Sequence, residues 1–274
     1  MWIKTIATAL LGMQLAVTPA HAQRTVTVRV ALSEAMAPAS FVEDGQASGM
    51  LKDMLKALFR NAPGYQAEFH AFPWTRAQRM VEAGEMDMFV TFPSGSRKEY
   101  ADFSPHAIYT LDYGNIIYDR TSSKSAQIEA ARSFEDLKGL TFISQESIAW
   151  EVDNIPPHIQ RYMVNGPPSL LHMTFQRKRG DFFIMPAEQA VYLARQFGYA
   201  GQLGMKKVSF IPNSQVEFHV GVRKTHPKQK ELLAVLNRAS QSPGFIAQRK
   251  AIERKYRELA IAGPQAKPPS SPPS

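Results

Sequence analysis

Apolar residues follow two spacings along this chain, one typical of a β-strand and one typical of an α-helix. From Val26 to Leu32 a valine or leucine occupies every second position, which predicts a strand. The segment 49–60 carries apolar residues at helical spacing, and Tyr65 to Ala71 alternates again. A strand, a helix and a second strand in this order predict an α/β fold with a largely parallel sheet.

The stretch 72–104 continues this order and holds the densest set of structural signals. Its first part predicts a helix that carries Trp74 on its apolar stripe and ends at Gly84. The mostly apolar run 87–92 follows and is typical of a strand that is buried on both faces of a parallel sheet.

Candidate chemistry first arises at the turn after this strand. Ser96 and Glu99 fit a capping box, so Arg97 is expected to open the next helix. A guanidinium group at a helix N-terminus, with the hydroxyl groups of Thr91 and Ser94 beside it, is suited to hold an anion. The alternative is an ordinary surface arginine after a loop.

The second half of the chain repeats this order of elements. A strand is predicted over 140–144, a helix over 169–179, a strand over 181–185 and a helix over 186–197. The helix–Gly–Asp–strand–helix order echoes the stretch 72–104, so two similar lobes are expected. Two further helices, over 229–240 and 243–259, are expected to dock on the first lobe.

The predicted organisation has a discontinuous first lobe. Residues 23–116 and 219–262 form this lobe, and 117–218 contain the two crossings and the second lobe. Residues 263–274, rich in proline and serine, are predicted to be a disordered tail.

Residues 1–22 have the features of an export signal. Lys4 precedes an apolar core over 6–17, and Ala20-His21-Ala22 is a small-x-small cleavage site. The apolar core is too short to span a bilayer, so we expect cleavage before Gln23 and release into the periplasm. The chain has no cysteine, which excludes disulfide bonds, thiol chemistry and a lipoprotein anchor.

Charge and motifs narrow the function further. The formal net charge is +8, and removal of residues 1–22 leaves +7, spread along the chain without the mixed basic and aromatic pattern of a nucleic-acid-binding protein. The histidines have no metal-ligand spacing, and there is no phosphate loop, Rossmann glycine cluster or nucleophile elbow. No nucleic acid, metal, cofactor or catalytic residue is therefore predicted.

The signals in 72–105 together resemble a known family. A helix, Gly-x-x-Asp, a strand, a Thr/Ser loop, Arg97 and Asp-Phe-Ser-Pro are similar to the first-lobe signature of periplasmic (extracellular) solute-binding proteins of family 3, the polar amino-acid-binding type of ABC transporters. Leu137-Lys138-Gly139 resembles the family's second-lobe signature. The resemblance implies a two-lobed, type II periplasmic-binding-protein-like fold, in which each lobe is a mostly parallel sheet flanked by helices and two strands form the hinge.

In the first lobe, the resemblance implies that Arg97 clamps a ligand carboxylate. Thr91 and Ser94 lie in the family's hydroxyl-rich loop, which is about two residues shorter here. Trp74 takes the position of an apolar cleft-wall residue, where an indole can stack on a ring or a cation. The alternative for Trp74 is core packing, and core packing is also expected for Trp150.

In the second lobe, the amino-acid pattern of the family is incomplete. Glu146 and Ser147 stand where the family shows Gly-Thr-Thr, and the aspartate that receives an α-ammonium group falls near Pro186. Glu188 lies two residues later and either replaces that aspartate or sits on the helix surface.

Two functions from different classes follow. The first is a monomeric protein that captures a small carboxylate-bearing or amino-acid-like solute between its lobes, for an ABC transporter permease or a membrane sensor. The alternative is a secreted enzyme similar to cyclohexadienyl dehydratase, in which Arg97 holds the substrate carboxylate and Glu146 or Glu188 is the general acid.

Overall fold

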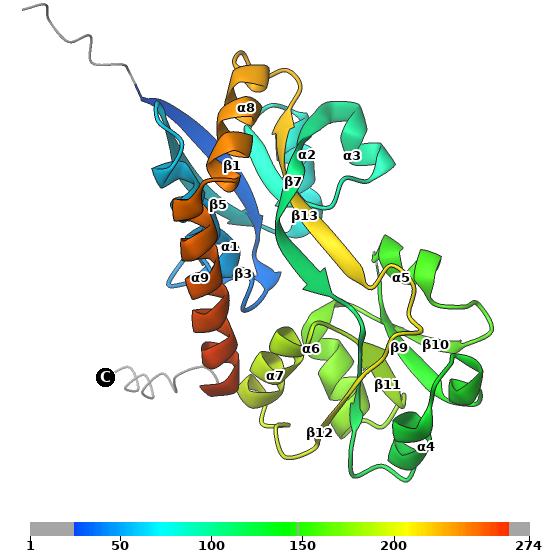
Figure 1. Ribbon diagram of the computed structural model, residues 1–274. Helices are drawn as coiled ribbons and strands as arrows, with labels where there is room; N and C mark the ends of the chain where they lie inside the picture. The colour runs from blue at the N-terminus through cyan, green and yellow to red at the C-terminus, as the bar shows by residue number, and fades with distance from the viewer. Residues whose placement is uncertain (1–24, 147, 263–274) are drawn as a thin grey trace, which may run out of the picture.

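A computed structural model describes residues 25–146 and 148–262 of the chain. The predicted export signal, Ser147 and the predicted tail lie outside the described residues. Two five-stranded sheets, each flanked by helices, form an upper and a lower lobe, which confirms the predicted two-lobed α/β fold (Figure 1).

The first lobe contains most of the N-terminal half and the C-terminal helices. Its elements are β1 (Val26–Ser33), β2 (Ala35–Met36), β3 (Ser40–Glu43), β4 (Gln46–Ser48), α1 (Met50–Arg60), β5 (Tyr65–Phe72), α2 (Trp74–Glu82), β6 (Met88–Thr91), α3 (Gly95–Tyr100), β7 (Ala101–Asp112), β13 (Gln215–Arg223), α8 (Gln229–Ser240) and α9 (Pro243–Ala262). The main sheet has the order β5-β1-β6-β13-β7, and β2, β3 and β4 form a small separate sheet.

The second lobe lies between β7 and β13 in the sequence. Its elements are β8 (Asn115–Asp119), α4 (Ser125–Ala130), a 3-10 turn (Glu135–Leu137), β9 (Thr141–Gln145), α5 (Ala149–Asn154), β10 (Gln160–Val164), α6 (Gly166–Leu171), a π-helical turn (His172–Gln176), β11 (Phe182–Ile184), α7 (Ala187–Gln196) and β12 (Leu203–Lys207). The sheet order is β10-β9-β11-β8-β12.

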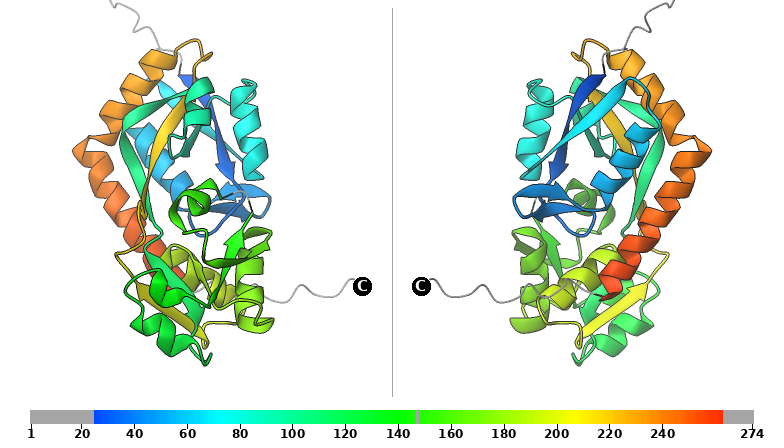
Figure 2. Two further views of the ribbon diagram at one scale, coloured as in Figure 1. Left: turned by 90° about the vertical axis from the view of Figure 1, so that its right-hand side faces the viewer. Right: turned by 90° about the vertical axis from the view of Figure 1, so that its left-hand side faces the viewer.

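The two sheets repeat one topology and exchange one strand. In each sheet the fourth strand comes from the far end of the other half of the chain, and it runs antiparallel to both neighbours. The chain therefore crosses between the lobes twice. The crossings are hydrogen-bonded to each other, from Tyr113 N to Ser214 O (2.8 Å) and from Val208 N to Gly114 O (2.9 Å). Figure 2 shows both crossings along one side of the molecule.

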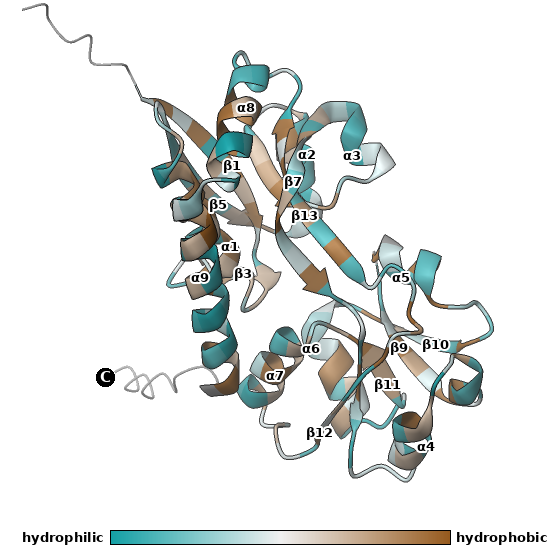
Figure 3. Cartoon of the chain, in the orientation of Figure 1, coloured by the Kyte–Doolittle hydropathy of each residue, from teal (hydrophilic) through white to brown (hydrophobic). Residues whose placement is uncertain are grey.

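Each lobe has its own hydrophobic core, built from the strands and the helix faces that cover them (Figure 3). All four residues of β6 are buried because this strand is central in its sheet, as its apolar sequence predicted. In α1 the apolar residues at helical spacing are the buried ones, from Met50 to Phe59.

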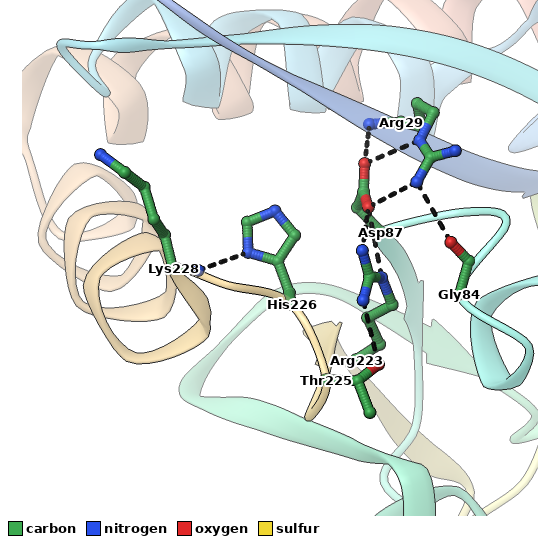
Figure 4. A network of polar contacts seen from close by, with 7 residues as sticks. All are labelled: Arg29, Gly84, Asp87, Arg223, Thr225, His226 and Lys228. Carbon is green, nitrogen blue, oxygen red and sulfur yellow. Dashed lines mark hydrogen bonds and ion pairs between the residues drawn. The ribbon is translucent and has the colours of Figure 1, made fainter.

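The aspartate of the Gly-x-x-Asp signature has a structural role at the far end of β6 from the second lobe (Figure 4). Asp87 accepts the backbone N–H of Arg29 on β1 (2.9 Å) and pairs with the guanidinium groups of Arg29 and Arg223, each at 3.0 Å. In the second lobe, Asp181 accepts the N–H of Thr141 on β9 at 2.8 Å. In both lobes, therefore, an aspartate before a central strand satisfies a backbone donor of its parallel neighbour.

Several local predictions are corrected by the structure. Helix α3 begins at Gly95, and its N-cap is Ser94, whose Oγ accepts the N–H of Arg97 (3.4 Å). The capping box at Ser96 is therefore wrong, and Arg97 is the third residue of the helix. Helix α9 packs on α7 of the second lobe as well as on α1, so it does not dock on the first lobe alone.

Candidate functional site

The topology directs the carboxyl ends of most strands toward the space between the lobes. β7 ends at the first crossing, and β1, β5 and β6 run in the same direction as β7. In the second lobe β8 leaves the first crossing, and β9, β10, β11 and β12 run back toward it. Open α/β sheets bind ligands outside the carboxyl ends of their strands, so the candidate site lies between the lobes.

Arg97 is held rigidly at the end of the first-lobe loop that follows β6. Its side chain is only 9% exposed. The Nε–H donates to Gln78 Oε1 at 2.9 Å, and Nη1 donates to the carbonyl of Phe92 at 3.2 Å. The guanidinium also lies over the ring of Phe92, at 4.4 Å, and over that of Trp74, at 5.5 Å from the ring centroids.

Within the part of the chain that the structure describes, no carboxylate pairs with Arg97. Both of its hydrogen-bond acceptors are neutral, and its Nη2 donates to neither of them. Burial accordingly lowers the pKa of Arg97 from its ordinary value. A buried cation without a counter-ion is unfavourable, and an anionic ligand group would compensate for it.

Trp74 links Arg97 to the core of the first lobe. Its indole stacks on Phe89 at 6.1 Å, and Arg97 lies over the same ring system. Trp74 is only partly buried, so it combines core packing with a position beside Arg97.

The hydroxyl residues of the first lobe have distinct surroundings. Thr91 ends β6, is 2% exposed and lies opposite His219 on β13. Ser94 caps α3, and its Oγ is 3.1 Å from that of Ser96. The structure thus brings Ser94 and Arg97 into direct contact and places Thr91 at the start of the loop that carries them.

The two glutamates predicted in the second lobe do not lie against Arg97. Glu146 is exposed, and its backbone N–H donates to Val164 O at 2.9 Å. Glu188, in the first turn of α7, lies 3.8 Å from Arg257 on α9, and its side chain is 43% exposed. Ser147 lies outside the described residues.

A cavity of about 290 Å³ adjoins the first crossing on the side of α9. Its lining comes from the loop after β1, from β7, from the start of α7 and from α9. Glu188 is the one predicted site residue that lines it, whereas Arg97 and Trp74 do not. The tyrosines and arginines contributed by β7 and α9 come from distant segments, and no local pattern marked them.

Gln78 and Phe92 are the site residues that sequence reasoning missed. Gln78 lies one helical turn after Trp74, so the spacing i, i+4 places both on one face of α2. This signal was available, but only the fold shows that this face meets Arg97. Among the described residues, no group of three or more His, Asp or Glu side chains is arranged to hold a metal ion.

Comparisons with known proteins agree with this geometry. The sequence matches the bacterial extracellular solute-binding proteins, family 3, over residues 28–257. No curated protein sequence matches the chain.

Similar solved structures share the fold at low sequence identity. One is an amino-acid ABC transporter substrate-binding protein from Streptococcus pneumoniae bound to L-arginine, with 18% identity, a TM-score of 0.65, and coverage of 86% of this chain and 96% of that chain. A histidine kinase sensor domain similar to periplasmic binding proteins has 18% identity, a TM-score of 0.64, and coverage of 85% and 97%. An ancestral amino-acid-binding protein, a precursor of cyclohexadienyl dehydratase, has 21% identity, a TM-score of 0.63, and coverage of 84% and 95%.

The family match spans nearly all of the described residues, including the loop of Arg97 and both crossings. These are the parts of the chain that build the site between the lobes. The chain therefore belongs to the bacterial extracellular solute-binding proteins of family 3.

Proposed function

We propose that the solute bound by this protein is small and carries a carboxylate, and that Arg97 receives this group. The observation that carries the proposal is the 9% exposure of a guanidinium that pairs with no acid among the described side chains. Charge-assisted hydrogen bonds from arginine to a carboxylate are short and often bidentate. Trp74 then offers a flat apolar surface next to that group, which suits an amino-acid-like solute.

Capture in this proposal depends on movement of the lobes about the two crossings. We place the first lobe at 23–116 plus 219–262 and the second within 117–218. The exchange of β8 and β13 supports this division, since the crossings lie next to these strands. Closure would exclude water from Arg97 and strengthen its contact with a carboxylate.

The captured solute passes, in this proposal, to an ABC transporter permease or is reported to a membrane sensor, and the protein acts as a monomer. Structural neighbours include an ABC transporter substrate-binding protein and a histidine kinase sensor domain, so the fold serves both uses. The dehydratase-like alternative is not favoured. It requires a glutamate shielded from solvent opposite Arg97, whereas Glu146 is exposed and Glu188 faces α9.

A thermal-shift screen tests this proposal. Amino acids and small organic acids are expected to include a compound that raises the melting temperature, because a ligand at 100 times its Kd stabilises the native state by about 2.7 kcal/mol. The same compound should reduce the radius of gyration in small-angle scattering. Its primary amide is the control and should have no effect. Stabilisation only by uncharged or cationic compounds would refute the carboxylate proposal.

We also propose export to the periplasm with cleavage before Gln23. The family is extracellular, and in the described part of the chain no helix is long and apolar enough to cross a membrane. Mass spectrometry of protein from the periplasmic fraction should give a chain that begins at Gln23. A chain that still begins at Met1 would contradict both the export signal and the location.

A further inference from the structure

Glu151 is a buried acid of the second lobe, beside the loop that faces the candidate site. It lies in the first turn of α5 and is 3% exposed. Its Oε2 accepts the hydroxyl of Ser144 and, at 3.2 Å, the backbone N–H of Gln145. These two residues end β9 at its carboxyl end, and 146–148 connect them to α5. The Glu151 carboxyl group therefore anchors both ends of this connection.

No cation neutralises the Glu151 carboxylate among the described side chains. Arg161 on β10 is the nearest charge of opposite sign, but its Nη2 donates to the backbone carbonyls of Glu151 (3.3 Å) and Ile155 (2.6 Å). Burial outweighs the hydrogen bonds from Ser144 and Gln145 and raises the pKa of Glu151 to about 7. The group therefore changes charge close to neutral pH.

Helix α5 also contacts both crossings between the lobes. The ring of Trp150 stacks on Tyr113 of the first crossing, at 4.6 Å and 20°. Its Nε1–H donates to the carbonyl of Asn213 in the second crossing at 2.8 Å, and Asn213 Nδ2 donates to Asn154 Oδ1 at 2.9 Å. A displacement of α5 would thus be felt at the hinge as well as in the 146–148 connection.

We infer that Glu151 is a positioning residue whose proton controls ligand capture, with the neutral carboxyl group holding 146–148 in the arrangement that accepts an anionic solute. This inference rests on the proposed function. Ionisation places an unpaired charge in a dry site, which draws water or counter-charge toward Glu151 and loosens its anchors. The new negative charge also lies on the second-lobe side of the site for an anion. Both effects weaken capture as the pH rises through neutrality.

The other charged groups around α5 do not account for such a change, except one. Arg161 stays protonated at any pH used here. Burial raises the pKa of Tyr113 to about 12. Asp153 is exposed on the same helix, and His158, which lies 3.2 Å from Glu135, carries an imidazole. Imidazoles ordinarily change charge in the same pH range, so His158 requires its own control.

A ligand-free titration tests the switch directly. In the chain that begins at Gln23, the variant Trp74→Phe leaves Trp150 as the single tryptophan, next to Glu151. Its fluorescence should change in one step near pH 7. The step should vanish in Glu151→Gln and remain in the matched controls Asp153→Asn and His158→Gln. Absence of the step, or its persistence in Glu151→Gln, would overturn the inference.

A second variant keeps the test valid if Glu151→Gln does not fold. Ser144→Ala removes a hydrogen bond that favours the ionised carboxylate, so the fluorescence step should move to higher pH. An unchanged midpoint in Ser144→Ala would contradict the assignment of the step to Glu151.

Calorimetry then tests the coupling to capture, with a carboxylate found in the thermal-shift screen. Affinity should fall about tenfold between pH 6 and pH 8.5, with proton uptake on binding, because linkage limits the slope to tenfold per pH unit. Glu151→Gln should bind with the low-pH affinity at every pH. A flat profile for the unmodified protein would overturn the coupling. If no carboxylate binds at any pH, the proposed function is wrong, and the fluorescence titration alone decides the role of Glu151.

Discussion

Arg97→Ala is expected to weaken binding of a carboxylate ligand by at least about tenfold to a hundredfold. Hydrogen bonds to charged groups contribute about 1.5–3 kcal/mol each, and about 1.4 kcal/mol corresponds to a tenfold change in Kd. Calorimetry with a ligand from the thermal-shift screen measures the loss. Arg97→Lys should recover only part of it, because an ammonium group cannot form the bidentate contact.

The matched control is Arg79→Ala, which removes an exposed arginine from α2, the helix that contributes Trp74 and Gln78. It should leave affinity unchanged. The melting temperature of unliganded Arg97→Ala should change little, since the lost contacts with Gln78 and Phe92 are offset by relief of an unpaired buried charge. Unchanged affinity in Arg97→Ala would remove Arg97 from the site, and a large drop in unliganded stability would make it a structural arginine.

Asp87→Asn is expected to reduce the free energy of unfolding by about 3 kcal/mol. Removing one partner of a buried ion pair typically costs about 3–5 kcal/mol, and the 40% exposure of the Arg29 side chain favours the lower end. The substitution leaves two guanidinium groups without their shared acceptor. For a domain of this size the melting temperature should fall by roughly 6–12 °C.

Asp181→Asn in the second lobe is the matched comparison for Asp87→Asn. Its carboxylate accepts the N–H of Thr141, and the structure shows no ion pair for it within the described chain, so the loss should be only about 1 kcal/mol. Equal losses in the two variants would mean that the arginines around Asp87 contribute little.

The Asp87 network also predicts a specific dependence on pH. Burial by itself raises the pKa of Asp87, but the hydrogen bonds from Arg29 and Arg223 outweigh it and lower the pKa from 3.8 to about 2. The resulting stabilisation, about 2 kcal/mol, is present above pH 3.8 and is lost as the pH falls through 2. Denaturant unfolding between pH 5 and pH 2 should show this loss in the unmodified protein and a shallower slope in Asp87→Asn.

Local patterns in the sequence predicted the long elements and the loop that carries Arg97. Alternation in β1, helical spacing in α1 and the apolar run of β6 each reflect which side of a single element is buried, and that side is written in consecutive residues. The short strands β10 and β12 escaped prediction because they lie at the edges of their sheet, where most of their side chains are not buried.

Which side chains meet was decided by the tertiary structure. Gln78, Phe92 and Trp74 surround Arg97 because α2 and the loop after β6 pack on one side of the first sheet. Glu188 looked equally suitable for a ligand contact or a helix surface, and its nearest ion partner proved to lie on α9. The sequence by itself therefore determined the α/β repeat and the anion-binding arginine. Only the fold determined the partners of charged residues, because those contacts join segments far apart in the chain, beyond the range of local periodicity.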